Sequence, residues 1–371
     1  MKLILLQENL EKALSLINRT ANLKTQLPIT TNALIKTKNG EIEITATDLE
    51  NTTRITIEGK VEKEGGILLP TKTLTEVVAA LPKEQVVIET EGLSAEIRSS
   101  KHKAKINGIS PSEFPEPQEE KGEQKVAIDS ILRNIKTVVF ASSSDESRAV
   151  LTGILIRFTE EGMLIVATDG YRLSLKKIAE KTKTQELQNL IIPARILGEI
   201  AKIAKEREKQ NGETEGILSI GGAKNQAIFS LPGIKFFTRL IEGEYPAFEK
   251  IIPQSNSTQA IFDKDEFLSA VRLSSVFARE GANIIKLTLS RKGITLSANA
   301  PQVGENRCEI EGNLKGEENE IAFNSRFLLD FLANVDTKEI SFEMTGPLNP
   351  GVFKIPGDNS YLHIIMPVRV Q

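Results

Sequence analysis

The residue types that most often perform chemistry are sparse in this sequence. His102 lies in the first third of the chain, His363 lies near its end, and Cys308 is the one cysteine. The sequence has no HExxH pair, no GxxxxGK[ST] phosphate loop, no GxGxxG turn and no cysteine pair that could hold a metal. We therefore expect no catalytic residue, no metal site and no cofactor.

Two aspartates could form an acid–base or metal-binding pair. Asp48 and Asp169 each follow Ala-Thr at the end of a strand-like run, 121 residues apart, but the third such run, LSANA, has Ala300 at that place. Asp169-Gly170 is also typical of a tight turn between antiparallel strands. A turn role is the better interpretation. A metal-dependent hydrolase using these aspartates stays open as an alternative, and it would contain stoichiometric divalent metal when purified.

These aspartates belong to a longer internal repeat, and the same order of predicted helices and strands recurs in each copy. A stripe of apolar residues with helical spacing recurs after 121 residues, and again more weakly in the last third of the chain. The three stripes are Leu10, Leu14 and Ile17; Ile131, Ile135 and Val138; and Phe267, Ala270 and Val271.

Each copy also predicts a second helix, several strands and a closing proline. The second helices begin at Pro70-Thr71, Pro193 and Asn324-Ser325. Runs such as EIEITA and IKLTLS alternate as half-buried antiparallel strands do. The copies close on Phe114-Pro115, Tyr245-Pro246 and Met366-Pro367. The fold class is therefore α+β, three tandem copies of a two-helix, antiparallel-sheet unit, with domains at 1–121, 122–253 and 254–371.

Charge and composition limit the kinds of partner. The chain has 371 residues, with 47 basic and 50 acidic residues and a net charge of −3. This balance argues against a protein that grips nucleic acid with a wholly positive surface, but not against one with a local basic face. The single cysteine favours a reducing compartment, and no run is long enough to cross a membrane, so we expect a cytoplasmic protein.

In order and length, these units resemble the beta subunit of bacterial DNA polymerase III, the DNA sliding clamp. The most specific segments are SSSDESRAVLTG (142–153), VATDGYRLS (166–174), GEYPAFEKIIP (243–253) and YLHIIMPVRV (361–370). The resemblance implies a non-enzymatic processivity factor, a ring-forming homodimer with helices lining the hole around double-stranded DNA. The implied partners are the polymerase III alpha subunit, clamp-loader subunits, and other polymerases and repair proteins that carry clamp-binding peptides.

The resemblance also implies a peptide-binding pocket between the second and third units. Met, Leu, Ile and Val would form an adaptable apolar surface, and Thr168, Arg172 and Arg369 would orient the peptide. The pocket residues would be Leu151, Thr168, Gly170, Tyr171, Arg172, Leu173, Pro246, Ile251, Leu348, Ile364, Met366, Pro367, Val368 and Arg369.

Two further surfaces follow from the family pattern. DNA would be contacted by Lys24, which matches a DNA-contacting basic position of the family, and by Arg195 and Lys202 on a predicted helix. At the dimer interface, Ile106 of one protomer would pack near Val276 and Phe277 of the other. A repeat scaffold that binds proteins but never DNA is the remaining alternative, and it would not be retained on circular DNA.

Overall fold

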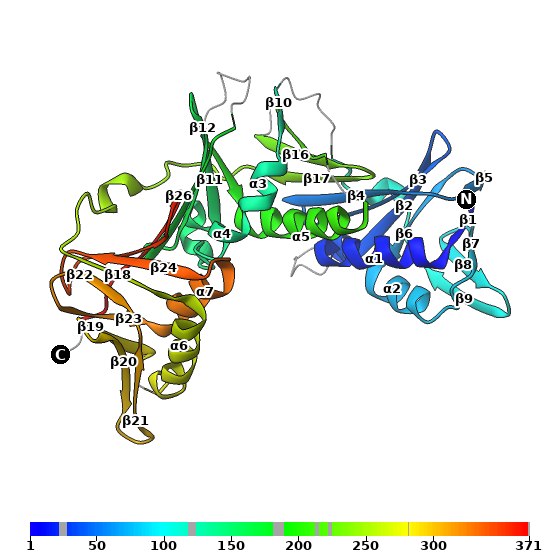
Figure 1. The fold of residues 1–371 in the computed structure, drawn as a ribbon. Coiled ribbons are helices and arrows are strands. Elements are labelled where there is room, and N and C mark those ends of the chain that lie inside the picture. Colours follow the sequence, from blue (N-terminus) through cyan, green and yellow to red (C-terminus); the bar gives the residue numbers. More distant parts are fainter. Residues whose placement is uncertain are drawn as a thin grey trace. The chain divides into compact units, whose positions relative to one another are not determined.

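The structure, a computed structural model, describes residues 1–21, 28–117, 124–180, 189–211, 215–221, 225–280 and 282–369. The chain forms two compact units (Figure 1). The first consists of Met1–Asp129 and Glu206–Leu240, and the second of Ser130–Lys205 and Ile241–Gln371. Each unit is described by itself below.

The first unit contains two antiparallel sheets. One has the strand order β5-β1-β7-β8-β9 and the other the order β10-β15-β16-β17-β4-β3-β2-β6. The strands of the first sheet are β1 (Lys2–Leu6), β5 (Lys60–Lys63), β7 (Gln85–Glu91), β8 (Ser94–Ser99) and β9 (His102–Asn107). Those of the second are β2 (Asn32–Lys38), β3 (Glu41–Thr47), β4 (Asn51–Ile57), β6 (Gly66–Pro70), β10 (Gln124–Ala127), β15 (Ile217–Gly221), β16 (Gln226–Leu231) and β17 (Ile234–Arg239).

Two helices of the first unit, α1 (Gln7–Ala21) and α2 (Thr71–Ala79), lie side by side (Figure 1). The stripe predicted from the sequence, Leu10, Leu14 and Ile17, is buried, as helical amphipathicity requires. Short 3-10 turns η1 (Pro28–Thr31) and η2 (Pro111–Glu113) connect these elements to the strands.

The second unit has a nine-stranded sheet in the order β14-β11-β12-β13-β26-β25-β24-β18-β22 and a four-stranded sheet in the order β21-β20-β19-β23. The first comprises β11 (Gly153–Thr159), β12 (Gly162–Thr168), β13 (Arg172–Ile178), β14 (Leu190–Pro193), β18 (Thr258–Asp263), β22 (Asn313–Gly316), β24 (Glu339–Met344), β25 (Gly351–Ile355) and β26 (Asp358–Ile365). The second comprises β19 (Ile284–Ser290), β20 (Gly293–Ala300), β21 (Gly304–Ile310) and β23 (Asn319–Asn324).

Helices α6 (Lys264–Ala278) and α7 (Ser325–Asn334) pack together in the second unit. Their N-caps are Asp263, which accepts from the amides of Asp265 and Glu266, and Asn324, which accepts from the amide of Arg326. The remaining elements are α3 (Asp129–Asn134), α4 (Lys136–Val139), η3 (Glu146–Thr152) and η4 (Phe248–Ile251), together with α5 (Ala194–Asn211), which passes from the second unit into the first.

The first helix predicted for the middle copy is wrong in one respect: it is broken into α3 and α4. Ile131, Ile135 and Val138 are buried as expected. However, the Thr137 hydroxyl donates to the Asn134 carbonyl at 2.7 Å, while the amide of Val138 donates to the Ile135 carbonyl. A side-chain hydroxyl thus occupies a carbonyl that a continuous helix would bond through its backbone.

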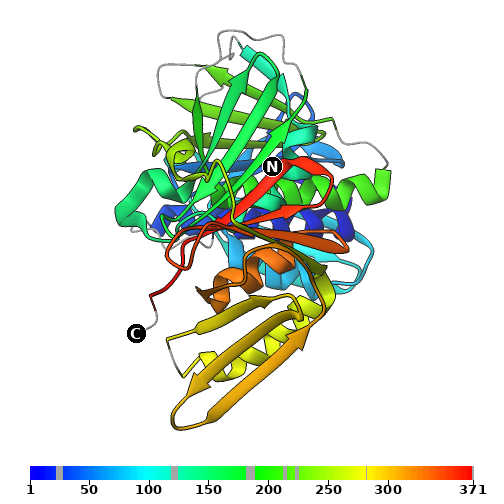
Figure 2. The same cartoon turned by 60° about the vertical axis from the view of Figure 1, so that its left-hand side comes forward.

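The sheets are not confined to single copies of the repeat. β4 of the first copy pairs with β17 of the second, so one sheet holds strands from both. Likewise β13 of the second copy pairs with β26 of the third, which Figure 2 shows as a red strand beside the green strands of the middle copy. An edge strand presents unpaired backbone groups, and here the last strand of the following copy covers it. By contrast, β9 and β21 lie at the edges of their sheets.

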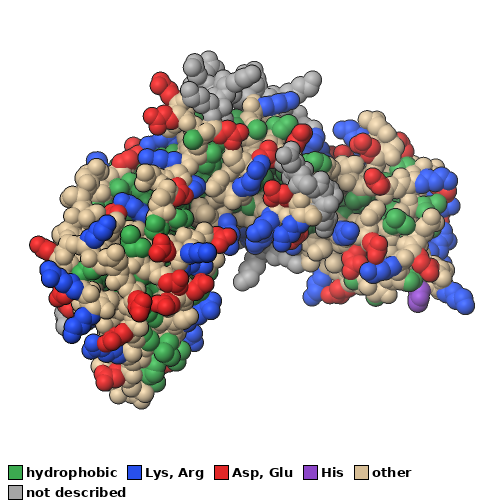
Figure 3. Space-filling view, viewed as in Figure 1, with side chains coloured by type: hydrophobic (Ala, Val, Ile, Leu, Met, Phe, Trp, Pro, Cys, Tyr) green, Lys and Arg blue, Asp and Glu red, His purple; other side chains and the backbone are tan. Residues whose placement is uncertain are grey.

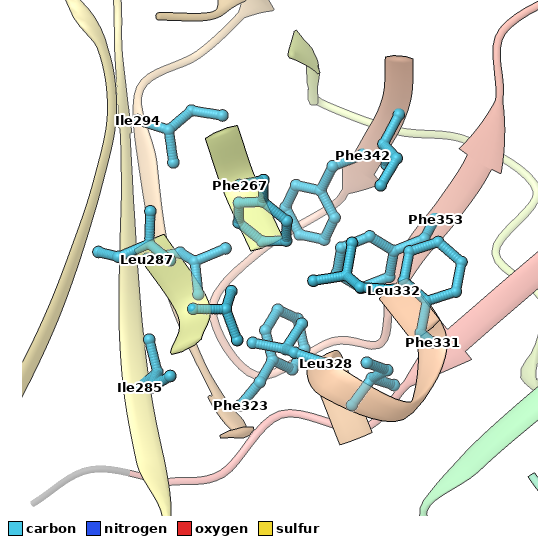
Figure 4. Close-up of a cluster of buried hydrophobic side chains, with 14 of the residues drawn as sticks. Phe267, Ile285, Leu287, Ile294, Phe323, Leu328, Phe331, Leu332, Phe342 and Phe353 are labelled. Atoms are coloured by element: carbon cyan, nitrogen blue, oxygen red, sulfur yellow. The ribbon is translucent and has the colours of Figure 1, made fainter. Parts of the chain in front are cut away.

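The core of the third copy is rich in phenylalanine. Phe323, Phe331, Phe342 and Phe353 come from β23, α7, β24 and β25 and contact one another (Figure 4). A Cβ atom on Gly351 would lie 2.4 Å from the Phe323 ring, so the aromatic packing requires glycine there. This core supports the end of the sheet where β26 finishes.

Candidate peptide-binding site

A five-residue turn between β12 and β13 is held by side-chain oxygens. The Thr168 hydroxyl donates to the Arg172 carbonyl at 2.6 Å and accepts from the Gly170 amide at 3.1 Å. The Asp169 carboxylate accepts from the amides of Tyr171 and Arg172 at 2.9 and 3.0 Å. Gly170 takes a positive φ of 92°, which glycine adopts without strain. The turn leaves the Tyr171 side chain 60% exposed.

The turn between β3 and β4 repeats this arrangement. Thr47 donates to the Asn51 carbonyl at 3.1 Å and accepts from the Leu49 amide at 3.0 Å. The Asp48 carboxylate accepts from the amides of Glu50 and Asn51. The two aspartates therefore close equivalent turns, as the turn interpretation of the sequence predicts.

Arg172 is engaged within its own chain. Its Nε donates to Asp169 at 3.0 Å, and one Nη donates to Asp330 on α7 at 2.6 Å. The guanidinium lies over the rings of Phe327 and Phe140, at 4.6 and 5.8 Å from their centroids. Only 10% of the side chain is exposed.

An apolar cluster lies beneath this turn, where β13 and β26 pair. Leu173 is opposite Ile364, and both side chains are fully buried. Phe248 of η4 packs in the same cluster. The Arg157 guanidinium lies over the Phe248 ring at 5.2 Å and forms an ion pair with Glu249, which fixes η4 against the sheet.

The residues after β26 cross this end of the sheet. The amide of Met366 donates to the Tyr171 carbonyl at 2.8 Å, and the amide of Val368 donates to the Ala322 carbonyl of β23 at 2.8 Å. Met366, Pro367 and Val368 are half-buried, whereas Arg369 is exposed. The segment is thus attached at one end to the turn and at the other to the third copy.

Other predicted residues border the same region. Leu151, which is half-buried, belongs to η3, and its carbonyl accepts from the Ser143 amide at 2.9 Å. Pro246 and Ile251 flank the anchored Phe248 and are exposed. Leu348 is 59% exposed in the loop before β25, whose first residue pairs with the last residue of β26.

The structure therefore groups the predicted pocket residues around the paired strands β13 and β26 of the nine-stranded sheet, at different depths. Thr168, Leu173 and Ile364 are buried beneath the surface. We define the tail patch as eight of the exposed or half-buried residues: Tyr171, Pro246, Ile251, Leu348, Met366, Pro367, Val368 and Arg369.

Three residues beside this patch were missed by the sequence analysis. Arg148, inside the quoted segment 142–153, donates to the Asp169 carbonyl at 2.9 Å. Phe327 and Asp330 hold Arg172 from α7. Their spacing of three residues puts both on one face of a predictable helix, but nothing in the sequence indicates which loop that face meets.

The basic residues predicted to face DNA are placed as follows. Arg195 and Lys202 are exposed on α5, two helical turns apart, and Lys202 pairs with Glu199 at 2.8 Å. Figure 3 shows Lys and Arg side chains gathered over this helix. Lys24 lies outside the described residues.

The residues predicted for the dimer interface lie at or near open sheet edges. Ile106 is on the edge strand β9 with 7% of its surface exposed. Val276, on α6, is 52% exposed, and Phe277 is partly buried against the core of the third copy. α6 packs against β21, an edge strand of the four-stranded sheet.

Within the described part of the chain, no group of three or more His, Cys, Asp or Glu side chains could hold a metal ion. No helix in the same residues is both long and apolar enough to span a membrane.

Three family models match nearly the whole chain. They describe the N-terminal, central and C-terminal domains of the DNA polymerase III beta subunit, and they match residues 1–118, 125–247 and 249–369.

Similar proteins agree with these matches. The chain is 31% identical to the beta sliding clamp of Staphylococcus aureus over 93% of each chain, and 30% identical to that of Bacillus subtilis over the full length of both. The crystal structure of the Bacillus subtilis DNA polymerase sliding clamp superposes with a TM-score of 0.91 at 29% identity, covering both chains completely. A sliding clamp from Bartonella birtlesii bound to griselimycin gives 0.92 at 26% identity, again with full coverage of both chains.

Proposed function

This chain belongs to the DNA polymerase III beta subunit family, the DNA sliding clamps, and we propose that it captures its protein partners through the tail patch. The observation that carries the proposal is the convergence of four separate segments. The turn from Thr168 to Arg172, the loop before β25 and the residues after β26 meet at one end of the nine-stranded sheet, and η4 packs on the face of that sheet through Phe248. Their accessible side chains are largely apolar, and a buried cluster anchors them from below.

Such a surface suits short peptides. Tyr171, Ile251 and Leu348 each expose 40% or more of their surface, whereas Met366 is half-buried and can change rotamer. Arg369 supplies an exposed positive charge at the rim. The occupants would be the apolar peptide motifs of the polymerase III alpha subunit, clamp-loader subunits, other polymerases and repair proteins.

The clamp would hold DNA by topology rather than affinity. A net charge of −3 does not favour extensive phosphate contact, and many such contacts would have to break at each step along the duplex. A closed ring needs only weak, sequence-independent contact, for which Arg195, Lys202 and Lys24 are the candidates. This work requires no catalytic residue, metal or cofactor, and it takes place on DNA in the cytoplasm.

Ring closure would use two of the open sheet edges, those at β21 and β9. β4 and β13 follow equivalent turns, and each pairs with a strand from the next copy. The equivalent strand in the third copy, β21, has an open edge, and so does β9 in the first copy. Pairing β21 of one protomer with β9 of another would continue the same rule and give a head-to-tail dimer.

The tail patch is tested by removing exposed side chains. We expect Leu348→Ala combined with Met366→Ala to weaken binding of a fluorescent peptide carrying the C-terminal residues of the alpha subunit by about 2–4 kcal/mol. Leu93→Ala is the matched control, because Leu93 is 60% exposed, close to the 59% of Leu348, but lies in the first unit. Fluorescence anisotropy measures the peptide affinity of the double variant and of the control. Equal affinities for the double variant and the control would place the peptide elsewhere.

A further inference from the structure

Arg172 connects two copies of the repeat at the tail patch. It begins β13 in the middle copy, whereas Asp330 and Phe327 belong to α7 in the third copy. Asp330 accepts from the guanidinium at 2.6 Å, and the Phe327 ring faces it at 4.6 Å. Because Asp169 accepts from Nε as well, the guanidinium is already balanced by two carboxylates. With 10% of its side chain exposed, Arg172 has little surface left for a peptide.

The equivalent turn in the first copy shows that this arginine is not needed to form the turn. Asn51 stands at the corresponding place, and its turn has the same pattern of Thr and Asp hydrogen bonds. The Asn51 side chain donates to Asp48 and accepts from Thr238 of β17. The contact between Arg172 and α7 is thus an additional feature of this turn, which the turn does not need in order to form.

The contact between Arg172 and Asp330 matters for the tail patch because the residues after β26 are bonded both to the turn that carries Arg172 and to the strand that leads into α7. Met366 is bonded to the carbonyl of Tyr171, next to Arg172. Val368 is bonded to Ala322 in β23, the strand that leads directly into α7. The segment 366–369 is therefore held between the turn and the element that carries Asp330.

We infer that Asp330 is a positioning residue for peptide capture, which acts through Arg172 and is supported by the Phe327 ring. Asp330 fixes the turn against α7 and thereby holds Tyr171 and Met366 in the positions in which they contact a peptide. Arg172 then works as an internal tie, and Arg369 remains the exposed cation of the patch. This inference rests on the proposed peptide-binding function.

The direct test uses Asp330→Asn, which keeps the shape of the side chain and removes its charge. We expect about a tenfold weaker affinity for the alpha-subunit peptide, a typical size for the loss of a coupled contact. Asp330→Glu should recover most of the affinity. Asp336→Asn is the control, since Asp336 is exposed just beyond the end of α7. Unchanged affinity in Asp330→Asn would overturn the inference.

A double-mutant cycle separates positioning from direct contact. If Asp330 acts through Arg172, Asp330→Asn should have no further effect once Arg172 is replaced by Gln. If Arg172 instead binds the peptide, releasing it from Asp330 should leave affinity unchanged or increase it. Independent effects of the two substitutions would overturn the inference.

A second readout does not depend on any peptide. Hydrogen exchange of the amides of Tyr171, Arg172 and Met366 should speed up in Asp330→Asn while the core amides of β13 stay protected. Faster exchange, together with wild-type protein that fails to bind the peptide, would reject the proposed function and show that Asp330 orders the turn without serving peptide capture. Unchanged exchange would reject the positioning role itself.

Discussion

The Oγ of Ser174 lies 2.6 Å from Nδ1 of His363 across the paired strands β13 and β26. His363 is fully buried and stacks on the Phe331 ring at a centroid distance of 4.9 Å. Its Nε2 has no hydrogen-bond partner among the described residues. Burial, and secondarily the charge of Arg172, hold the pKa of His363 well below its usual value. The folded protein therefore keeps this histidine neutral.

A neutral buried histidine makes stability depend on pH. The unfolded chain binds a proton at His363 below about pH 6.5, whereas the folded chain does not until its lower pKa is reached. The stabilisation is complete above pH 6.5 and is lost as pH falls towards the folded pKa. We expect His363 to contribute a slope of up to about 1.4 kcal/mol per pH unit in that window.

Urea unfolding followed by circular dichroism at several pH values measures this slope. His363→Gln keeps an acceptor for Ser174 but cannot titrate, so its free energy of unfolding should fall less steeply below pH 6.5. His102→Gln, at an exposed position on β9, should retain the wild-type slope. Parallel curves for wild type and His363→Gln would contradict the assignment.

Local features of the fold were predictable because they depend on residues close in sequence. The helical stripes, the N-cap at Asn324 and the turns at Asp48 and Asp169 all follow from spacings of a few residues. The break between α3 and α4 was missed, because the apolar stripe continues across it and does not show that the Thr137 hydroxyl bonds the Asn134 carbonyl there. The domain limits near 121 and 254 remain predictions.

The membership of the site remains a prediction, and the sequence did not indicate how deeply each of its residues is buried. Family resemblance selected Leu173 and Tyr171 alike, and the structure buries the first while exposing 60% of the second. The pairing of Arg172 with Asp330 spans 158 residues. No periodicity reports a contact between side chains so far apart in sequence, so only the folded chain reveals it.

DNA retention should depend on the shape of the DNA. We expect weak, salt-sensitive binding to short linear duplex, because few phosphate contacts are available. After loading by an ATP-driven loader, the protein should stay on nicked circles and leave when they are cut. Lys24→Ala should slow loading with little change in thermal stability. Gel filtration measures the fraction of labelled protein that stays with each form of DNA. Equal retention on linear and circular DNA would exclude topological binding.

Deleting residues 366–371 should abolish peptide capture and leave the dimer intact. The deletion removes the backbone bonds of Met366 and Val368 but no residue of a strand. Peptide anisotropy and light scattering should therefore respond differently, with binding lost and mass unchanged. A truncated protein that binds the alpha-subunit peptide as tightly as the intact chain would show that the segment is dispensable.

The dimer should be broken by charge on α6. Val276→Asp with Phe277→Asp places two carboxylates where the partner's β9 would approach, and uncompensated buried charge is strongly destabilising to an interface. We expect a folded monomer near 40.8 kDa by light scattering, whereas the wild type should have twice that mass. Leu273→Asp is unsuitable as a control because Leu273 lies on the same helix, so Leu49→Asp in the first unit serves instead.

The internal repeat also predicts the register of the dimer contact. In the first unit Ile44 pairs with Ile55, which pairs with Ile234. Ile234 is the first paired residue after the two-residue turn of its hairpin. His102 holds the same place after the turn between β8 and β9.

The third copy supplies the other half of this comparison. In the repeat, Ala298 of the third copy corresponds to Ala46 of the first, so Leu296 corresponds to Ile44. Leu296 pairs with Cys308, as Ile44 pairs with Ile55. Cys308 therefore corresponds to Ile55, and it should lie opposite His102 of the partner subunit.

The same register puts Gly304 opposite Ile106 of the partner. A Cβ atom on Gly304 would lie 3.9 Å from the Phe277 ring, so Ile106 and Phe277 would meet, as the sequence predicts.

His102→Cys should consequently form a disulfide with Cys308 of the partner subunit. Directly opposite residues of antiparallel strands have Cα atoms about 4.5–5.5 Å apart and side chains on one face, which suits a disulfide. Mild oxidation should give a covalent dimer on a non-reducing gel, and Cys308→Ser should prevent it. Lys103→Cys is the control, because adjacent residues of a strand point to opposite faces. An intact dimer in which Lys103→Cys crosslinks as fast as His102→Cys would show that the strands meet in another register.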